Sequence, residues 1–461
     1  MYKSVVVIGA GISGLCVAHW LKKHGLSVTV LEKDSEAGGT MKTIHDNGWL
    51  VETGPNSALE TTPLFSQLFD ELGISNQRIY ANALADKRYI LRDKNLHPLP
   101  MGPGTFLTSK LWSVRGKLRL LKEPFIGRAT KEESIAEFVV RRLGQEFLDY
   151  AINPFVAGVY AGIPEQLSVQ AAFPKLYALE EKYGGLMKGM IQGRRERKQR
   201  VEKSKDRAKL FSFIDGMGTL PKAAASSLGT VIRLNCSVER IVPVRAGASP
   251  MYHVSYLKNG TRTTIESRVV VISTPAPVAS KIVHDIDPEM SRLLESIYYP
   301  PVTVVFTGFE QSHIPRILDG FGFLVPTVEQ RQILGTLWSS SLFPDRAPKN
   351  CEALTTFVGG ARQPDLAQKN DDEIKQIVLT ELQSLMGIHR HAIFIRIIRW
   401  ERAIPQYNVG YRKILNAIDM FEQNFQGAFI CSNYRGGISV GDCLTSAHKI
   451  ATQVTQYLNK V

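Results

Sequence analysis

The N-terminal stretch KSVVVIGAGISGLCVAHWLKKHGLSVTVLEKD, residues 3–34, constrains the fold more than any other part of the chain. It begins with a continuous apolar run, as a buried parallel strand does, and continues with apolar residues at helical spacing. Between these elements, Gly9, Gly11 and Gly14 form the pattern GxGxxG, and a second strand ends at Glu32. The sequence therefore predicts a βαβ unit of an α/β, Rossmann-type dinucleotide-binding fold.

This glycine turn suits a pyrophosphate, because glycine lets the backbone come close and a helix N-terminus stabilises the negative charge. Glu32 stands 18 residues after Gly14, where it could accept a hydrogen bond from a ribose hydroxyl. An acid at this position favours an unphosphorylated ribose. The alternative is a glycine turn that holds no ligand.

A second glycine-rich turn lies near the C-terminus, in FICSNYRGGISVGDCLTSAHKIATQVTQYL, residues 429–458. The stretch reads as a strand, a turn and an amphipathic helix. A helix N-terminus offers free N–H groups and a favourable dipole to a negative charge. The turn is therefore a candidate anion site, and the alternative is a simple helix cap formed by Asp442.

The composition is ordinary for a globular chain, with 44% hydrophobic and 21% charged residues. No apolar run is long enough to cross a membrane, and we expect no cleavable leader because the first strand begins at Ser4. Five cysteines without metal-ligand spacing suit single buried thiols in a reducing cytosol. His389 and His391 lack a third ligand, so we expect no metal.

The net charge of +13 comes largely from residues 194–209, which hold nine basic and three acidic side chains. This stretch is either a solvated helix or loop, or a surface for an anionic membrane. Nucleic acid is disfavoured, because no aromatic residues lie between the basic ones.

The middle of the chain changes character twice. Residues 91–193 look inserted and helical, with one amphipathic helix expected over residues 131–155, and form either an ordinary helical subdomain or an interfacial membrane surface. Residues 232–241 are expected to form a strand, with Val238 exposed near its turn. Alternating strands are expected at residues 301–310, 320–326, 332–343, 352–360 and 393–405, with a helix at residues 370–387. They would form a mixed or antiparallel sheet that walls a substrate cavity.

Residues 35–57, SEAGGTMKTIHDNGWLVETGPNS, carry a second glycine pair and a strand where a nicotinamide dehydrogenase would continue with another helix. This continuation resembles the two-domain flavoproteins that include amine oxidases, carotenoid desaturases and protoporphyrinogen oxidases, in which the dinucleotide is FAD. Lys42 stands where that group often has arginine. A lysine still neutralises a phosphate but lacks the bidentate fork.

Six further segments are similar to the oxygen-dependent protoporphyrinogen IX oxidase family over essentially the full chain: FVAGVYAG, GFGFLVP, SSSLFPDRAP, TTFVGGARQPDLA, RWERAIPQYNVGY and NYRGGISVGDC. The resemblance implies oxidation of protoporphyrinogen IX to protoporphyrin IX in haem or chlorophyll synthesis. Six electrons would leave through FAD to dioxygen, giving hydrogen peroxide, and the flavin N5 rather than a side chain would do the chemistry. It also implies a homodimer in the cytoplasm, attached peripherally to the inner membrane.

The resemblance implies three parts. They are a Rossmann-type FAD-binding domain (residues 1–83, 207–285 and 401–461), a mixed-sheet substrate-binding domain (84–92 and 286–400) and an inserted helical membrane-binding domain (93–206). The FAD ligands implied are Gly9, Ala10, Gly11, Ile12, Ser13, Gly14, Glu32, Lys33, Gly39, Lys42, Gly54, Pro55, Asn56, Ser57, Val238, Trp400, Ile438, Ser439 and Val440.

The resemblance also implies five substrate contacts. Arg88 would pair with a propionate, or else form a surface salt bridge. Phe357 would stack on one pyrrole ring, and Leu324 and Leu337 would sandwich another, unless the three are ordinary core residues. The backbone of Gly158 would face the macrocycle.

Three other functions remain open from the sequence. Coproporphyrinogen III oxidation would use the same chemistry on a substrate with four propionates, and would need cations besides Arg88. An amine oxidase usually has an acid in place of Asn433, and an aromatic pair beside the flavin. A porphyrin or lipid carrier with structural FAD would never let its substrate reduce the flavin.

Overall fold

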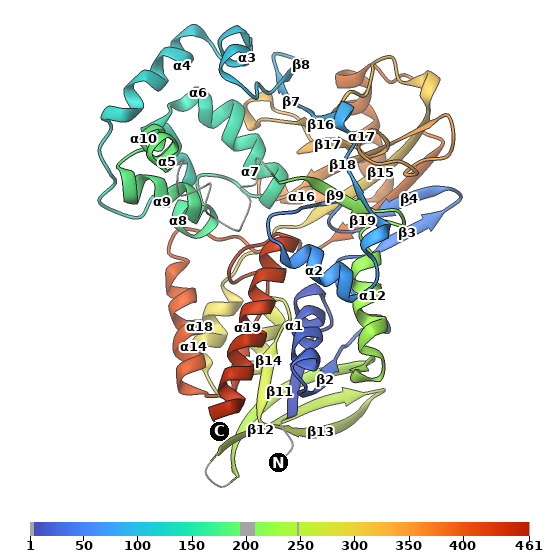
Figure 1. Cartoon of the computed structure of the whole chain (residues 1–461). Helices are drawn as coiled ribbons and strands as arrows, with labels where there is room; N and C mark the ends of the chain where they lie inside the picture. The colour runs from blue at the N-terminus through green and yellow to red at the C-terminus, as the bar shows by residue number, and fades with distance from the viewer. Residues whose placement is uncertain (1–3, 194–207, 247–248, 461) are drawn as a thin grey trace.

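The computed structural model describes residues 4–193, 208–246 and 249–460. Figure 1 shows a parallel sheet with its helices in the lower half, a second large sheet at the upper right and a group of helices at the upper left. No helix of the described residues is long and apolar enough to span a bilayer.

The parallel sheet has the order β10-β2-β1-β14-β20. Its strands are β1 (Ser4–Ile8), β2 (Ser27–Leu31), β10 (Ile232–Arg233), β14 (Val269–Ile272) and β20 (Ala428–Ile430). Side chains alternate across a strand, so Val5 and Val7 pack on one face while Val6 and Ile8 pack on the other. Both faces are covered by helices, which explains why β1 is apolar throughout.

One face carries α1 (Ile12–Lys23), α2 (Leu64–Glu71), α12 (Thr219–Leu228) and α19 (Val440–Lys460). The other carries α13 (Ala276–Val283), α14 (Pro288–Glu295) and α18 (Arg412–Asn424). Helices α1 and α19, the first and last of the chain, lie side by side (Figure 1). The predicted βαβ unit and C-terminal helix are confirmed.

Three small sheets surround this core. An antiparallel sheet contains β11 (Cys236–Ala246), β12 (Ser249–Lys258) and β13 (Thr261–Ser267), and a hairpin contains β3 (Thr43–Asp46) and β4 (Trp49–Glu52). The third has the order β5-β9-β6, with β5 (Ala58–Leu59), β9 (Leu210–Phe213) and β6 (Arg78–Tyr80).

The upper sheet has seven strands in the order β19-β15-β18-β17-β16-β7-β8. Their bounds are β7 (Lys87–Arg92), β8 (Asn95–Pro98), β15 (Val302–Glu310), β16 (Gly320–Leu324), β17 (Gly335–Trp338), β18 (Cys351–Gly359) and β19 (Phe394–Trp400). All pairs are antiparallel except β16 with β7, so the predicted mixed sheet is confirmed. Helix α17 (Asp371–Met386) packs its apolar side on the back face, and the short helices α15 (Ser339–Leu342) and α16 (Pro364–Ala367) complete this part.

The helical group contains α3 (Pro103–Thr108), α4 (Val114–Arg119), α5 (Ile135–Arg142), α6 (Gln145–Phe147), α7 (Asn153–Tyr160), α8 (Val169–Ala172), α9 (Pro174–Tyr183) and α10 (Leu186–Gln192). The single helix predicted over residues 131–155 was wrong. Gly144 adopts φ +101°, a left-handed conformation that ends α5, and a π-helical turn at Leu148–Ile152 precedes α7.

Two strand predictions need correction as well. The strand at residues 232–241 is interrupted, because Asn235 turns the chain at φ +56°, and Val238 is half-buried rather than exposed. The strand at residues 332–343 ends at Trp338 and is followed by α15. Most of the basic stretch at residues 194–209 lies outside the described residues, and the described part of the chain contains no group of metal-ligating side chains.

Candidate flavin and substrate site

The three glycines of the first glycine turn have different structural roles. Gly9 has φ +100°, and a Cβ on Gly14 would lie 2.0 Å from the carbonyl oxygen of Gly9, so no larger residue fits there. A Cβ on Gly11, in contrast, would meet no atom within 4 Å. The turn therefore needs glycine at position 14 in order to form. Gly11 instead leaves open space at the N-terminus of α1, where an anionic group can approach.

The second glycine pair packs directly on this turn. Gly38 N donates to Ala10 O at 2.8 Å, and a Cβ on Gly39 would lie 3.2 Å from Gly11 Cα. Lys42 follows at the edge of the same turn, and its ammonium group lies 2.6 Å from Glu36. The structure thus brings the two glycine motifs together on one side of the parallel sheet.

Glu32 follows β2 at the carboxyl end of the sheet and is only 6% exposed. One carboxylate oxygen accepts from Ala10 N at 2.6 Å and the other from Asp34 N at 2.9 Å. Each oxygen keeps a lone pair, so a ribose hydroxyl can still bind. The neighbouring Lys33 is exposed, and the strand that carries Val238 is tied to Glu32 by the bond from Cys236 N to Glu32 O.

Sequence reasoning missed two hydroxyl residues. Ser273 and Thr274 follow β14, the strand beside β1, and their side-chain oxygens are buried without a partner among the described residues. A Cβ on Gly9 would lie within 3.3 Å of atoms of both. Buried hydroxyls normally have partners, so these two point to a polar ligand at the turn. The available signal was the apolar run VVVI directly before them, which is typical of a buried parallel strand.

The second glycine-rich turn ends at the N-terminus of α19, close to the first. Ser439 Oγ donates to Asp442 Oδ2 at 2.6 Å and accepts from Asp442 N, so the predicted cap exists. The N–H groups of Val440 and Gly441 have no partner among the described residues. A cap and an anion site are therefore compatible here.

Ile438 and Ser439, which precede this helix, are half-buried. The thiol of Cys443 on α19 hydrogen-bonds with Ser13 on α1, which places the two helix N-termini beside each other.

The GPNS loop, residues 54–57, lies between the two large sheets. A Cβ on Gly54 would lie 2.1 Å from Thr40 O, so the loop passes tightly over the second glycine motif. Trp400 Nε1 donates to Thr53 O at 2.7 Å. Pro55, Asn56 and Ser57 are half-buried. Trp400 thus fixes the start of this loop to the edge strand of the seven-stranded sheet.

The strand register places four predicted substrate residues on one sheet face. Directly paired residues share a face, and the pairs run from Arg88 to Gly322, Gly322 to Leu337, Leu324 to Gly335 and Gly335 to Phe357. The series continues through Val302 to Trp400. This set, Arg88, Leu324, Leu337, Phe357 and Trp400, defines the substrate face, and α17 covers the opposite one.

Three residues of this face, Leu324, Leu337 and Phe357, are half-buried, although most of the residues beside them in their strands are buried. Helix α7 lies over Leu324, because a Cβ on Gly158 would lie 2.6 Å from Leu324 Cδ2. Partial exposure between α7 and the sheet sets these three side chains apart from the ordinary core on the α17 side.

Arg88 lies at the rim of the substrate face and is exposed. Its guanidinium carbon lies 5.7 Å from the ring centre of Phe321. Two other arginines of the face are paired, Arg92 with Glu146 and Arg396 with Asp46, whereas Arg88 has no carboxylate partner among the described residues.

A narrow cavity connects the GPNS loop with the substrate face. Asn56 and Leu337 both line it, together with Glu52 and Arg346. Burial raises the pKa of Glu52 to about 7, although hydrogen bonds from Thr43 Oγ1 and Met217 N act to lower it. The GPNS loop and the substrate face therefore border the same small cavity.

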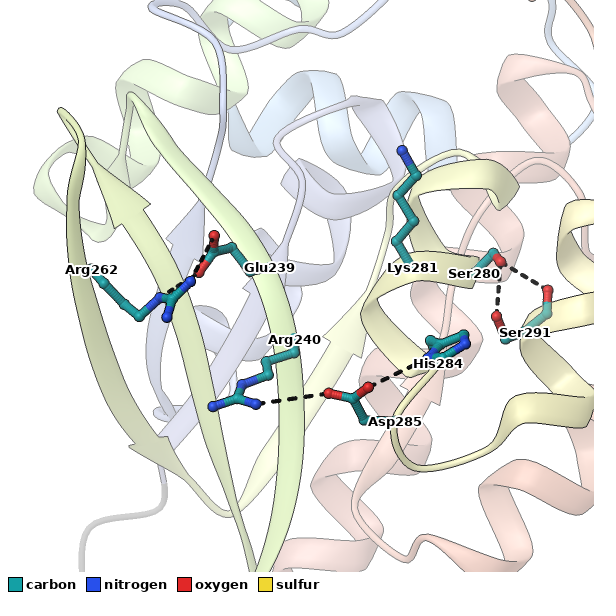
Figure 2. A pocket seen from close by; sticks show the side chains of 8 residues that line it. All are labelled: Glu239, Arg240, Arg262, Ser280, Lys281, His284, Asp285 and Ser291. Carbon is teal, nitrogen blue, oxygen red and sulfur yellow. Dashed lines mark hydrogen bonds and ion pairs between the residues drawn. The ribbon is translucent and has the colours of Figure 1, made fainter.

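A larger open cleft of about 390 Å³ lies elsewhere, between β11–β13 and the helices α13 and α14 (Figure 2). None of the predicted site residues lines it. Its charges pair with each other, Arg262 with Glu239 at 2.8 Å and Arg240 with Asp285 at 3.8 Å. The strands β11–β13 that line this cleft lie near the lower end of Figure 1, away from the seven-stranded sheet.

The profile of the flavin-containing amine oxidoreductases matches residues 12–455. The chain belongs to this family. Among curated relatives, protoporphyrinogen oxidase 2 of Arabidopsis thaliana is 34% identical, over 99% of this chain and 94% of its own length. Coproporphyrinogen III oxidase of Bacillus subtilis (strain 168) is 26% identical, over 99% of this chain and 98% of its own.

A solved structure from Exiguobacterium sp. 255-15, described as a protoporphyrinogen oxidase, has the same fold. It superposes with a TM-score of 0.81 at 23% identity, over 99% of both chains. Membership of the flavin-containing family makes this chain a flavin-dependent oxidoreductase with FAD as cofactor. The residues fit that group, because open space at Gly11, unpartnered hydroxyls of Ser273 and Thr274, and free N–H groups on α19 surround one region of the sheet edge.

Proposed function

We propose that the chain oxidises protoporphyrinogen IX to protoporphyrin IX, with dioxygen as the final acceptor. The substrate face carries this proposal, because half-buried apolar side chains stand beside a rim arginine, Arg88, for which the described part of the chain provides no carboxylate partner. A porphyrinogen with two propionates has the same distribution of apolar and charged groups. Full-length similarity to protoporphyrinogen oxidases, at 34% identity for the Arabidopsis enzyme, supports it.

In this proposal the side chains position the substrate and exclude water. Phe357 would stack on one pyrrole ring, Leu324 and Leu337 would hold another, and the backbone of Gly158 would lie against the macrocycle. Arg88 would bind a propionate. Bound FAD supplies two-electron oxidation, so the loss of six electrons and six protons takes three cycles and yields three molecules of hydrogen peroxide.

The proton balance does not require a catalytic side chain on the substrate face. Its central residues are apolar, and the nearest buried acid, Glu52, already accepts hydrogen bonds from Thr43 and Met217. The pyrrole N–H protons would leave to water or through tautomerisation. We propose FAD contacts at the glycine turns, Glu32, Lys42, residues 54–57, Trp400 and residues 438–440, and add Ser273 and Thr274.

Coproporphyrinogen III is the second candidate substrate, because the Bacillus subtilis relative spans the whole chain. A paired assay decides between them. The purified enzyme would receive either porphyrinogen in air, and porphyrin fluorescence and peroxide would be followed. Preference for protoporphyrinogen IX supports the proposal, whereas preference for coproporphyrinogen III would replace the substrate and keep the site. Flavin that neither substrate reduces under anaerobic conditions would refute both.

We further propose that the helical group docks peripherally on an anionic membrane. Residues 101–130, the apolar basic segment, expose Leu107, Val114, Leu118, Leu121 and Phe125 at 58–88%. Its only acid, Glu123, is fully buried, so every exposed charge on the segment is basic. Apolar and basic side chains together suit a lipid surface. The homodimer and the domain boundaries stay predictions.

A further inference from the structure

The loop that follows β18, residues 360–362, contacts both ends of α7. At the C-terminal end, Ala361 N donates to Ala161 O at 2.7 Å. At the N-terminal end, Arg362 Nη2 donates to Asn153 Oδ1 at 3.1 Å. One short loop therefore fixes the whole length of this helix.

Arg362 also binds the segment that follows β16. Its Nη1 donates to Val325 O at 2.8 Å. Asn153 Oδ1 accepts two more hydrogen bonds, from Thr327 N at 3.0 Å and Thr327 Oγ1 at 2.9 Å. Asn153 is 7% exposed and thus forms a buried junction between α7, β16 and β18.

Burial lowers the pKa of Arg362 to about 10, so the side chain remains a cation at neutral pH. No carboxylate forms an ion pair with it, and its Nε is buried without a partner among the described residues. Arg362 as a whole is half-buried and Glu165 acts to raise its pKa, so its main fixed contacts are the hydrogen bonds to Val325 O and Asn153 Oδ1.

Helix α7 depends on such outside contacts. It follows a π-helical turn and ends at Ala161, a non-glycine residue with φ +49°. In the middle of α7, Gly158 lies against Leu324. Phe357 lies on β18, five residues before Arg362. A shift of α7 would therefore change the space between the helix and the substrate face.

We propose that Arg362 is a positioning residue that sets the separation between Gly158 and Leu324, and thereby the fit of the porphyrinogen ring. The inference rests on the proposed function, and its test separates the two. Misplacement of a substrate by about 1 Å can change the rate a hundredfold, so a small movement of α7 is sufficient.

The kinetic test compares Arg362→Met with Arg399→Met in the FAD-loaded enzyme. Arg399 is a matched control, because it donates to Ala367 O and Asp371 on the opposite side of the sheet. In Arg362→Met, we expect KM for protoporphyrinogen IX to rise at least about fivefold. The flavin spectrum should stay unchanged, and Arg399→Met should keep the wild-type KM. An equal rise in both variants would overturn the proposal.

A second readout needs no substrate. Hydrogen exchange of the amides in residues 153–161 should be faster in Arg362→Met and unchanged in Arg399→Met. If Arg362→Met does not fold, Asn153→Ala carries the same expectation, because it removes the shared acceptor. Unchanged exchange would overturn the role of Arg362, whereas wild-type enzyme that fails to oxidise protoporphyrinogen IX would overturn the proposed function.

Discussion

Trp400 Nε1 donates to the carbonyl oxygen of Thr53 across 2.7 Å, and this bond joins the seven-stranded sheet to the loop that follows β4. Gly54 begins the GPNS loop directly afterwards. The bond lies at the edge of the sheet, and it thus sets the distance between the substrate face and the proposed flavin site. A change at Trp400 would act on both.

Gly11 and Gly14 provide the sharpest test of the pyrophosphate site. In Gly11→Ala the new Cβ enters open space, so we expect an unchanged melting temperature of the apoprotein and at least about tenfold weaker FAD binding. In Gly14→Ala the Cβ lies 2.0 Å from Gly9 O, so the fold should lose about 2–3 kcal/mol. Flavin-to-protein absorbance and thermal melts measure both effects. Full FAD retention in Gly11→Ala would move the cofactor away from this turn.

Arg88→Ala should weaken substrate binding without touching the flavin. A charge-assisted hydrogen bond contributes about 1.5–3 kcal/mol, so KM for protoporphyrinogen IX should rise at least about tenfold. Lys87→Ala is the matched control, since Lys87 points to the other sheet face and pairs with Asp319 at 2.6 Å. Steady-state kinetics and the flavin absorption spectrum provide the comparison. An unaltered KM in Arg88→Ala would exclude Arg88 from the substrate contacts.

Gly158→Ala tests the contact between α7 and the sheet. The added Cβ would lie 2.6 Å from Leu324 Cδ2, the end of a flexible side chain. The Leu324 side chain should therefore turn away from α7, into the space in front of the substrate face. We expect a higher KM and a melting temperature within a few degrees of wild type. Adding Leu324→Ala should relieve the crowding and restore part of the loss. A double variant that is weaker than both single variants would contradict direct contact.

Glu52 should make stability depend on pH. Burial raises its pKa from 4.5 to about 7, so between these values the native state binds more protons than the unfolded state. Unfolding free energy should therefore fall as pH rises through this window, by at most about 3 kcal/mol. Glu52→Gln resembles the protonated form and should remove this slope. Denaturant melts at several pH values measure it, and equal slopes in both proteins would exclude Glu52 as the cause.

Phe125→Glu should reduce membrane binding. The side chain is 88% exposed on the apolar basic segment, and losing its insertion costs roughly 2 kcal/mol. Ile317→Glu is the control, because Ile317 is 82% exposed outside that segment. Co-sedimentation with vesicles of phosphatidylcholine, with and without phosphatidylglycerol, measures binding. If both variants bind like wild type, the segment is not the docking surface.

The sequence predicted the elements that follow a strong local pattern. The βαβ unit, the C-terminal helix and the predicted strands of the upper sheet are where periodicity placed them, except that the strand at residues 332–343 ends at Trp338. Outside these elements, the break at Gly144 and the turn at Asn235 were not predicted. These two failed because a single left-handed residue ends an element whose apolar pattern continues through it. Local pattern alone gives no sign of such a turn.

The site shows a similar division. The glycine turns and Glu32 follow from spacing within one segment. Ser273 and Thr274 follow an apolar run, but their place beside the first glycine turn becomes clear only when β14 is placed next to β1, more than 200 residues away in the chain. The positioning role proposed for Arg362 likewise depends on the packing of α7 against β16. A sequence pattern within one segment does not reveal such packing.

The pairing of the chain's two ends also affects how the protein is made. Helix α1 precedes α19 by more than 400 residues in the chain, yet the two helices pack against each other. Strand β7 similarly pairs with β16, which follows more than 200 residues later in the chain. Contacts this distant in sequence form slowly, so nascent chains would expose half-built sheets until synthesis ends. The proposed FAD site includes the N-terminus of α19, so it would be complete only after this helix has folded.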